Sequence, residues 1–70
     1  MSNISEPLAL VQLNNGGKSS RVSVYSAEDV GRREITEIVF IRDPSGVELL
    51  RLRKNLRVGG PIYRLTDILR

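Results

Sequence analysis

The sequence predicts a mainly β fold: a small antiparallel sheet or a small barrel of four to five short strands, with one or two short helical turns. Three observations predict it. Apolar and polar residues alternate with a period of two over residues 20–25, as in a strand with one face in the core. Turn-forming residues punctuate the chain at residues 14–17, 43–46 and 59–61. The charges on both sides of the central turn agree with a single hairpin register.

The length of the chain predicts one thin core. With 70 residues, a domain buries only about 60% of the surface of its unfolded chain. We expect a flexible N-terminal tail over residues 1–7 and a single small β domain over residues 8–70. The chain contains neither Cys nor His, so it has no disulfide or zinc site to support the fold. Burial against another subunit is the expected substitute, and among homo-oligomers a dimer is favoured.

The first half of the chain predicts three strands. Residues 8–13 form the first, and the Asn and Gly residues at 14–17 form a tight turn because they tolerate positive φ. Residues 20–25 form the second strand, with Val22 and Val24 directed into the core. Ser26 begins a single helical turn, whose acidic residues Glu28 and Asp29 suit its positive end. A third strand covers residues 34–42.

The central segment predicts a hairpin that turns at Pro44 and Gly46. Pro presets φ for the first turn position, and Gly accommodates a bulge. The fourth strand then covers residues 47–53, extending as far as 58 if it remains regular. This register produces two opposite-charge pairs and one apolar face. The pairs are Arg42 with Glu48 and Glu37 with Arg53, and the expected core consists of Ile38, Phe40, Leu50, Leu52, Val22 and Val24.

The C-terminal segment has two interpretations. Residues 59–61 interrupt the sheet, because Pro cannot donate to a strand ladder. Ile62, Leu65, Ile68 and Leu69 fit one face of a helix, whereas residues 62–65 alone fit a short strand. We favour a short strand followed by a helical turn that begins at Thr66 or Asp67.

Two layouts resemble known families. The order of strand, Gly turn, second strand and later Gly-turn hairpin over residues 8–58 resembles SH3-like and Sm-like small barrels, which implies a strongly bent barrel. Residues 43–60 resemble the loop, helix and Gly exit of swapped-hairpin (AbrB-like) DNA-binding proteins, but the sequence lacks that family's Pro after the first strand. Neither resemblance assigns a role to a particular residue.

The composition argues against catalysis. Without His or Cys, the commonest general base and the thiol nucleophile are absent. The carboxylates form no convergent pair: Glu34 and Glu37 point to opposite faces of a strand. Residues 16–19 have the Gly-Gly-Lys-Ser ending of a phosphate-binding loop, but Gln12 stands where that motif requires its first Gly. We therefore expect no enzyme activity, no cofactor and no metal site.

Basic residues are the strongest functional signal. The net charge is +3, and nine Arg stand against two Lys. Arg favours bidentate contacts with phosphate, although a GC-rich coding sequence produces the same bias. In an extended strand, Arg51, Arg53 and Arg57 share one face, with Arg51 and Arg53 about 7 Å apart, close to phosphate spacing. The other interpretation of this row is an ordinary solvated face.

We expect a small non-enzymatic regulatory binding module that contacts the phosphates of DNA or RNA. Few aromatic residues are present, which favours duplex contact over base stacking. The candidate nucleic-acid-binding residues are Arg51, Arg53, Lys54, Arg57, Arg32, Arg33 and Arg64. The alternative is a protein interaction module, such as a small inhibitor or adaptor, that binds an acidic protein surface through an exposed strand edge or residues 62–69. With no apolar span or signal peptide, we expect an intracellular, cytoplasmic protein without a membrane partner.

Overall fold

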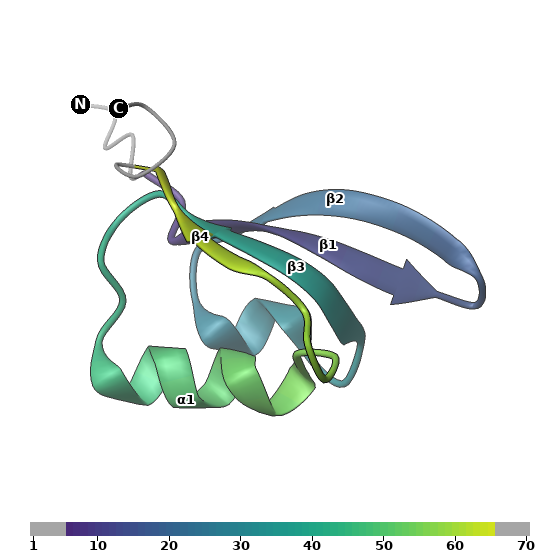
Figure 1. Ribbon diagram of the computed structural model, residues 1–70. Helices are drawn as coiled ribbons and strands as arrows, with labels where there is room; N and C mark the ends of the chain where they lie inside the picture. Colours follow the sequence, from purple (N-terminus) through teal and green to yellow (C-terminus); the bar gives the residue numbers. More distant parts are fainter. Residues whose placement is uncertain (1–5, 66–70) are drawn as a thin grey trace.

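The computed structural model describes residues 6–65 as one four-stranded sheet with helical segments on one of its faces (Figure 1). The elements in chain order are β1 (Ala9–Asn15), β2 (Lys18–Val24), the 3₁₀ helix η1 (Ala27–Val30), β3 (Glu34–Phe40), α1 (Gly46–Asn55) and β4 (Ile62–Arg64). The strand order is β2-β1-β3-β4. The mainly β class and the small sheet are confirmed, but the sheet is mixed rather than wholly antiparallel as predicted, because β3 and β4 pair in parallel. The sheet is open, so the barrel of the SH3-like and Sm-like layouts does not form.

β1 and β2 form the hairpin that the Asn and Gly residues predicted. Gly16 and Gly17 both have positive φ, +60° and +87°, as required in a two-residue turn whose twist matches the strands. Val11 pairs with Val22 and Ala9 pairs with Val24, so these residues share the inner face of the sheet. The first two predicted strands are confirmed, although the ends of each are displaced by one or two residues toward the turn.

β3 pairs antiparallel with the other side of β1, which places Ile38 beside Val11 and Phe40 beside Ala9. The third predicted strand is confirmed, but it ends at Phe40. The core lies between the inner face of the sheet and the helices. Its buried residues are Leu8, Ala9, Val11, Leu13, Val24, Val30, Ile35, Ile38, Phe40 and Leu52.

The predicted fourth strand over residues 47–53 is wrong, because this segment is helix α1. The side-chain oxygen of Ser45 accepts a hydrogen bond from the backbone N–H of Glu48, and the backbone N–H of Ser45 donates to the Glu48 carboxylate, both at 3.2 Å. This reciprocal capping box satisfies two N–H groups at the start of the helix. Leu49, Leu52 and Leu56 then recur with helical spacing and pack toward the core.

The helix also changes the predicted core. Leu52 is completely buried, but Leu50 is 65% exposed because residues two apart lie on nearly opposite sides of a helix. The expectation that Leu50 belongs to the core is therefore wrong. Those for Ile38, Phe40, Leu52 and Val24 are confirmed, and Val22 packs against the core while partly exposed.

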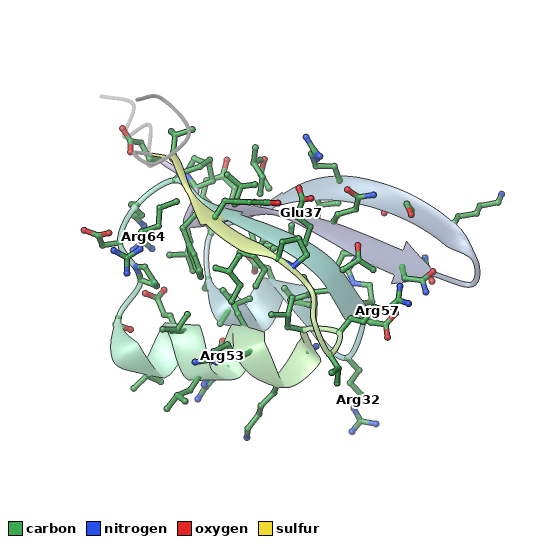
Figure 2. The ribbon with its side chains drawn as sticks, in the orientation of Figure 1. Arg32, Glu37, Arg53, Arg57 and Arg64 are labelled. Atoms are coloured by element: carbon green, nitrogen blue, oxygen red, sulfur yellow. The ribbon has the colours of Figure 1, made fainter. Side chains whose placement is uncertain are left out.

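The two predicted cross-strand charge pairs have different outcomes. Arg42 and Glu48 do form an ion pair, at 3.6 Å, but it joins the β3–α1 loop to the first turn of α1 rather than two strands. Glu37 pairs with Arg21 of β2, also at 3.6 Å. Figure 2 shows why Glu37 cannot reach Arg53: Glu37 lies on the sheet, whereas Arg53 lies on α1 beneath it.

β4 returns from α1 to pair in parallel with β3, with Ile38 opposite Ile62 and Phe40 opposite Arg64. The short strand predicted near residues 62–65 is confirmed. The helical turn predicted to begin at Thr66 or Asp67 lies outside the described residues. Between residues 6 and 65, no helix combines the length and apolar character needed to cross a membrane.

Candidate functional site

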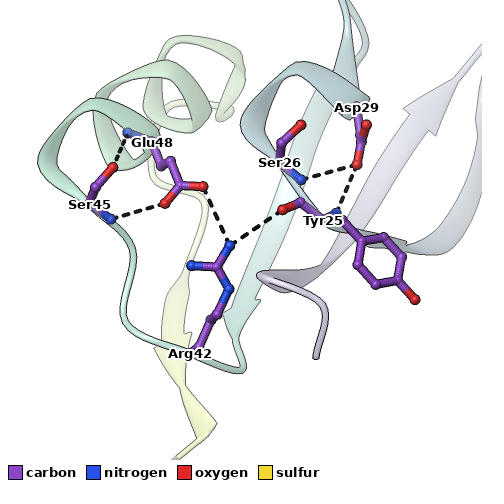
Figure 3. Close-up of polar contacts among 6 residues, drawn as sticks. All are labelled: Tyr25, Ser26, Asp29, Arg42, Ser45 and Glu48. Atoms are coloured by element: carbon purple, nitrogen blue, oxygen red, sulfur yellow. Dashed lines mark hydrogen bonds and ion pairs between the residues drawn. The ribbon is translucent and has the colours of Figure 1, made fainter. Parts of the chain in front are cut away.

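The β2–η1 turn is held by the carboxylate of Asp29. One oxygen of this carboxylate accepts hydrogen bonds from the backbone N–H groups of Tyr25, at 2.8 Å, and Ser26, at 3.1 Å (Figure 3). These bonds favour the ionised form and lower the pKa of Asp29, the bond from Tyr25 having the largest effect. Nearby, Arg42 approaches both the carbonyl oxygen of Tyr25 and the carboxylate of Glu48. Arg42 thereby links a residue that precedes the start of η1 to the first turn of α1.

A groove of about 400 Å³ lies where η1 and the loop after it face α1. Figure 1 shows the two helices side by side on the same face of the sheet. Three cations line the groove: Arg32 from the loop after η1, and Arg51 and Lys54 from α1. Arg51 and Lys54 are three residues apart and so share one side of the helix. The remaining lining residues are Ala27, Glu28, Gly31 and Asn55.

Asn55 fixes the loop that carries Arg32. Its side-chain Nδ2 donates to the carbonyl oxygens of Gly31, at 2.7 Å, and Arg33, at 3.0 Å. Gly31 has a φ of +65°, a conformation that favours glycine and turns the chain sharply after η1. The backbone on both sides of Arg32 is therefore tied to the last residue of α1.

The groove has a positive charge. Its single carboxylate, Glu28, binds the guanidinium of Arg51 at 2.8 Å, and both side chains are more than half exposed. Within residues 6–65, neither Arg32 nor Lys54 has a carboxylate within 4.0 Å. Two cations thus remain available to an anion, beside a third whose position Glu28 restricts.

Arg33, another of the predicted nucleic-acid-binding residues, supports the fold. Its guanidinium donates to the carbonyl oxygens of Val30, at 3.0 Å, and Asp29, at 2.8 Å. These carbonyls end η1, where a positive charge is favourable. Arg33 therefore closes the 3₁₀ helix, and it is not among the residues that line the groove.

The predicted row of Arg51, Arg53 and Arg57 is wrong, because it required an extended strand. On α1, Arg51 and Arg53 are about 200° apart around the axis. Arg57 lies beyond the helix, where its backbone N–H donates to the carbonyl of Ile35 at 2.8 Å. Figure 2 shows Arg64 at the opposite end of the molecule from Arg32 and Arg57. Of the predicted set, Arg32, Arg51 and Lys54 come together in this groove.

The outward side of α1 carries a second feature. Val47 and Leu50 are 64% and 65% exposed. With Arg51, Arg53 and Lys54 they line a shallow depression of about 450 Å³. Sequence reasoning missed this apolar surface because it placed Leu50 in the core. The spacing of Ser45 and Glu48, which is that of a capping box, is the signal in the sequence that could have indicated the helix and hence this surface.

The groove suits an anion with several oxygens, since guanidinium and ammonium groups supply multiple N–H donors. Compared with protein-family models, with curated proteins and with solved structures, the chain matches none. The chemistry of the groove is therefore the basis for assigning a function.

Proposed function

We propose that the protein is a small non-enzymatic regulatory module that binds the phosphate backbone of nucleic acid through the groove between η1 and α1. One observation carries the proposal: Arg32, Arg51 and Lys54, from two separate segments, line the same groove. Phosphate contacts supply most of the affinity of sequence-neutral binding, and several cations in one place are the feature they require.

The three cations have different roles. Arg32 and Lys54 contact phosphate oxygens directly, Arg32 through a bidentate guanidinium and Lys54 through a single ammonium. Arg51 is oriented by Glu28 and contributes the N–H groups that this carboxylate leaves unused. Arg53 extends the positive surface along α1, whereas Arg57 and Arg64 lie outside the groove lining.

The aromatic residues favour contact with the backbone over contact with the bases. Tyr25 and Tyr63 are half-exposed, but neither lines the groove. Tyr63 is on β4 and Tyr25 follows β2, so the sheet separates them. Stacking of successive bases requires aromatic rings along one binding track. We therefore expect similar affinity for different sequences and a preference for the regular phosphates of a duplex.

A salt-dependent titration with matched variants tests this proposal. Fluorescently labelled duplex and single-stranded DNA are titrated at several salt concentrations with the wild type, with Arg32→Gln/Lys54→Gln, and with Lys18→Gln/Arg64→Gln. Both variants lose two positive charges, but only the first loses them from the groove. Each lost phosphate contact reduces the slope of log affinity against log salt by about 0.9 for duplex. We expect this reduction only for the groove variant; equal effects of both variants, or no binding by the wild type, would refute the proposal.

A protein interaction module is the second candidate, and the exposed Val47 and Leu50 favour it specifically. Two apolar side chains bordered by Arg51, Arg53 and Lys54 suit an amphipathic segment with acidic flanks. The alternative partner is thus an acidic protein surface that binds the outward side of α1. Leu50→Gln separates the candidates, because it removes an apolar contact without changing charge: nucleic-acid affinity is expected to persist, and affinity for an acidic amphipathic peptide to fall.

A further inference from the structure

The two edges of the sheet differ in their capacity to accept another strand. β4 has three residues and directly follows Pro61, features that limit pairing at its edge. β2 has seven residues, no Pro and an uninterrupted register with β1. In the described part of the chain, nothing pairs with the outer side of β2 (Figure 1). β2 is therefore the edge open to another strand.

The hairpin geometry determines which backbone groups of β2 face outward. The carbonyl oxygen of Val24 accepts a hydrogen bond from the backbone N–H of Leu8 at 2.8 Å, so Val24 is directed toward β1. Successive residues of an antiparallel pair alternate between hydrogen-bonded and non-hydrogen-bonded positions. The N–H and C=O groups of Ser19, Arg21 and Ser23 are consequently directed away from β1.

The side chains of β2 offer little resistance to pairing. Charged residues commonly protect an exposed strand edge by repelling a second strand. On β2, however, Lys18 is at the hairpin turn and Arg21 is paired with Glu37 of the same sheet. Three of the remaining five residues are Ser, which is small and uncharged.

We propose that this edge pairs with the same edge of a second copy, antiparallel, with the two-fold axis at Val22. This register places Val22 opposite Val22 of the second copy and Arg21 opposite its Ser23. Val22 is on the inner face at the rim of the core and only partly buried, so the contact covers its exposed side. The inference concerns a different surface from the groove and does not depend on nucleic-acid binding.

The charges on β2 select this register over its neighbours. An axis at Arg21 puts Arg21 directly opposite the same residue of the second copy, which is destabilising. An axis at Ser20 puts Val22 opposite Lys18, where its apolar surface gains no apolar cover. An axis at Ser23 leaves only residues 22–24 of β2 to pair. Among the registers that pair five or more residues of β2, only the axis at Val22 joins apolar to apolar and places each Arg beside a neutral residue. A second copy is thus the occupant to which the edge is complementary.

Because the axis is perpendicular to the sheet, the inner faces of both copies lie on the same side. The two sheets become one continuous sheet with both α1 helices on one face. A pair of grooves then faces the same direction, an arrangement that one copy alone cannot provide.

A cysteine scan tests both the contact and its register, since the chain has no Cys of its own. Single Cys variants at residues 19–23 are oxidised gently and analysed by non-reducing electrophoresis. At a non-hydrogen-bonded pair the Cα atoms are about 4.5 Å apart, within the range for a disulfide. Val22→Cys is therefore expected to form dimers at least tenfold faster than Ser20→Cys, its matched control on the same face. The proposal would be overturned if cross-linking were fastest at another position, equally fast at all positions, or absent.

A backbone variant provides an independent test. Ser23→Pro removes an N–H that faces away from β1, as tolerated on an edge strand, whereas Ser23→Thr retains it. Sedimentation equilibrium is expected to show dimers of Ser23→Thr at concentrations at which Ser23→Pro is monomeric, with circular dichroism confirming both folds. Dimerisation of a folded Ser23→Pro variant with unchanged affinity would overturn the proposal. If Ser23→Pro does not fold, the cysteine scan decides.

Discussion

The side chain of Asn55 joins the end of α1 to the chain that follows η1, through a 2.7 Å hydrogen bond from its Nδ2 to the carbonyl oxygen of Gly31. A second bond from the same atom reaches the carbonyl of Arg33 at 3.0 Å. The position of Arg32 relative to Lys54 therefore depends on one amide group. A polar residue that lines the groove thus also holds together the two segments that carry its cations.

Replacing Asn55 by Asp tests this link. The two side chains have nearly the same shape, but a carboxylate cannot donate to the carbonyls of Gly31 and Arg33. Hydrogen bonds of this kind contribute about 0.5–1.5 kcal/mol each, and unpaired acceptors add a penalty, so we expect a loss of about 1–3 kcal/mol in urea unfolding. Asn55→Ala is the control without the added charge and is expected to be less destabilised. Wild-type stability of Asn55→Asp would contradict the proposed link.

Leu52 and Leu50 form a matched pair that distinguishes the helix from a hairpin. Leu52 is completely buried and Leu50 is 65% exposed. Leu52→Ala is expected to destabilise by about 2–5 kcal/mol, because it leaves a cavity in the core. Leu50→Ala is expected to change stability by about 0.5 kcal/mol or less, as at other exposed sites. Denaturant titration of both variants is the measurement, and similar losses would argue against helix α1.

Phe40 is the aromatic residue of the core, with 3% of its surface exposed. Truncation to Ala is expected to cost about 3–5 kcal/mol, a large part of the stability of a small domain. Thermal unfolding followed by circular dichroism is the measurement. An unchanged melting temperature for Phe40→Ala would show that the ring is not packed in the core.

The lowered pKa of Asp29 predicts how the stability of the fold changes as the pH falls. This pKa is lowered in the folded protein by the hydrogen bonds from Tyr25 and Ser26. A lowered pKa means that the carboxylate stabilises the fold above the ordinary value of about 3.9, and that this contribution is lost as the pH falls through the folded value. Asp29→Asn is expected to melt at a lower temperature than the wild type at pH 7, and the difference is expected to narrow toward pH 2. A difference that does not depend on pH would contradict this assignment.

The first three strands were predictable because their signals are local. Val22 and Val24 alternate with polar residues, and Gly16 and Gly17 permit the positive φ of their turn. The same logic failed for α1, whose leucines fit two periods: Leu50 and Leu52 are two apart, whereas Leu49 and Leu52 are three apart. The charges did not resolve the ambiguity.

Glu48 explains why. It is close enough to Arg42 to form an ion pair in a hairpin and also in the observed loop and helix, so that pair does not discriminate between them. The discriminating signal was Ser45 followed three residues later by Glu48, the pattern of a capping box. The candidate site was less predictable still, because Arg32 and Lys54 meet only through the packing of α1 on η1 and the bonds of Asn55.

The parallel pairing of β4 with β3 has a consequence for the order of folding. β1 and β2 meet across a two-residue turn, so their closure is fast, whereas Ile62 reaches Ile38 only after all of α1 has been placed. β4 is therefore expected to join last and to open first, and its amide protons to exchange with solvent sooner than those of β1. Until β4 joins, the edge of β3 that faces away from β1 has no strand to pair with. The interval before β4 docks is then the stage of folding at which aggregation competes most strongly.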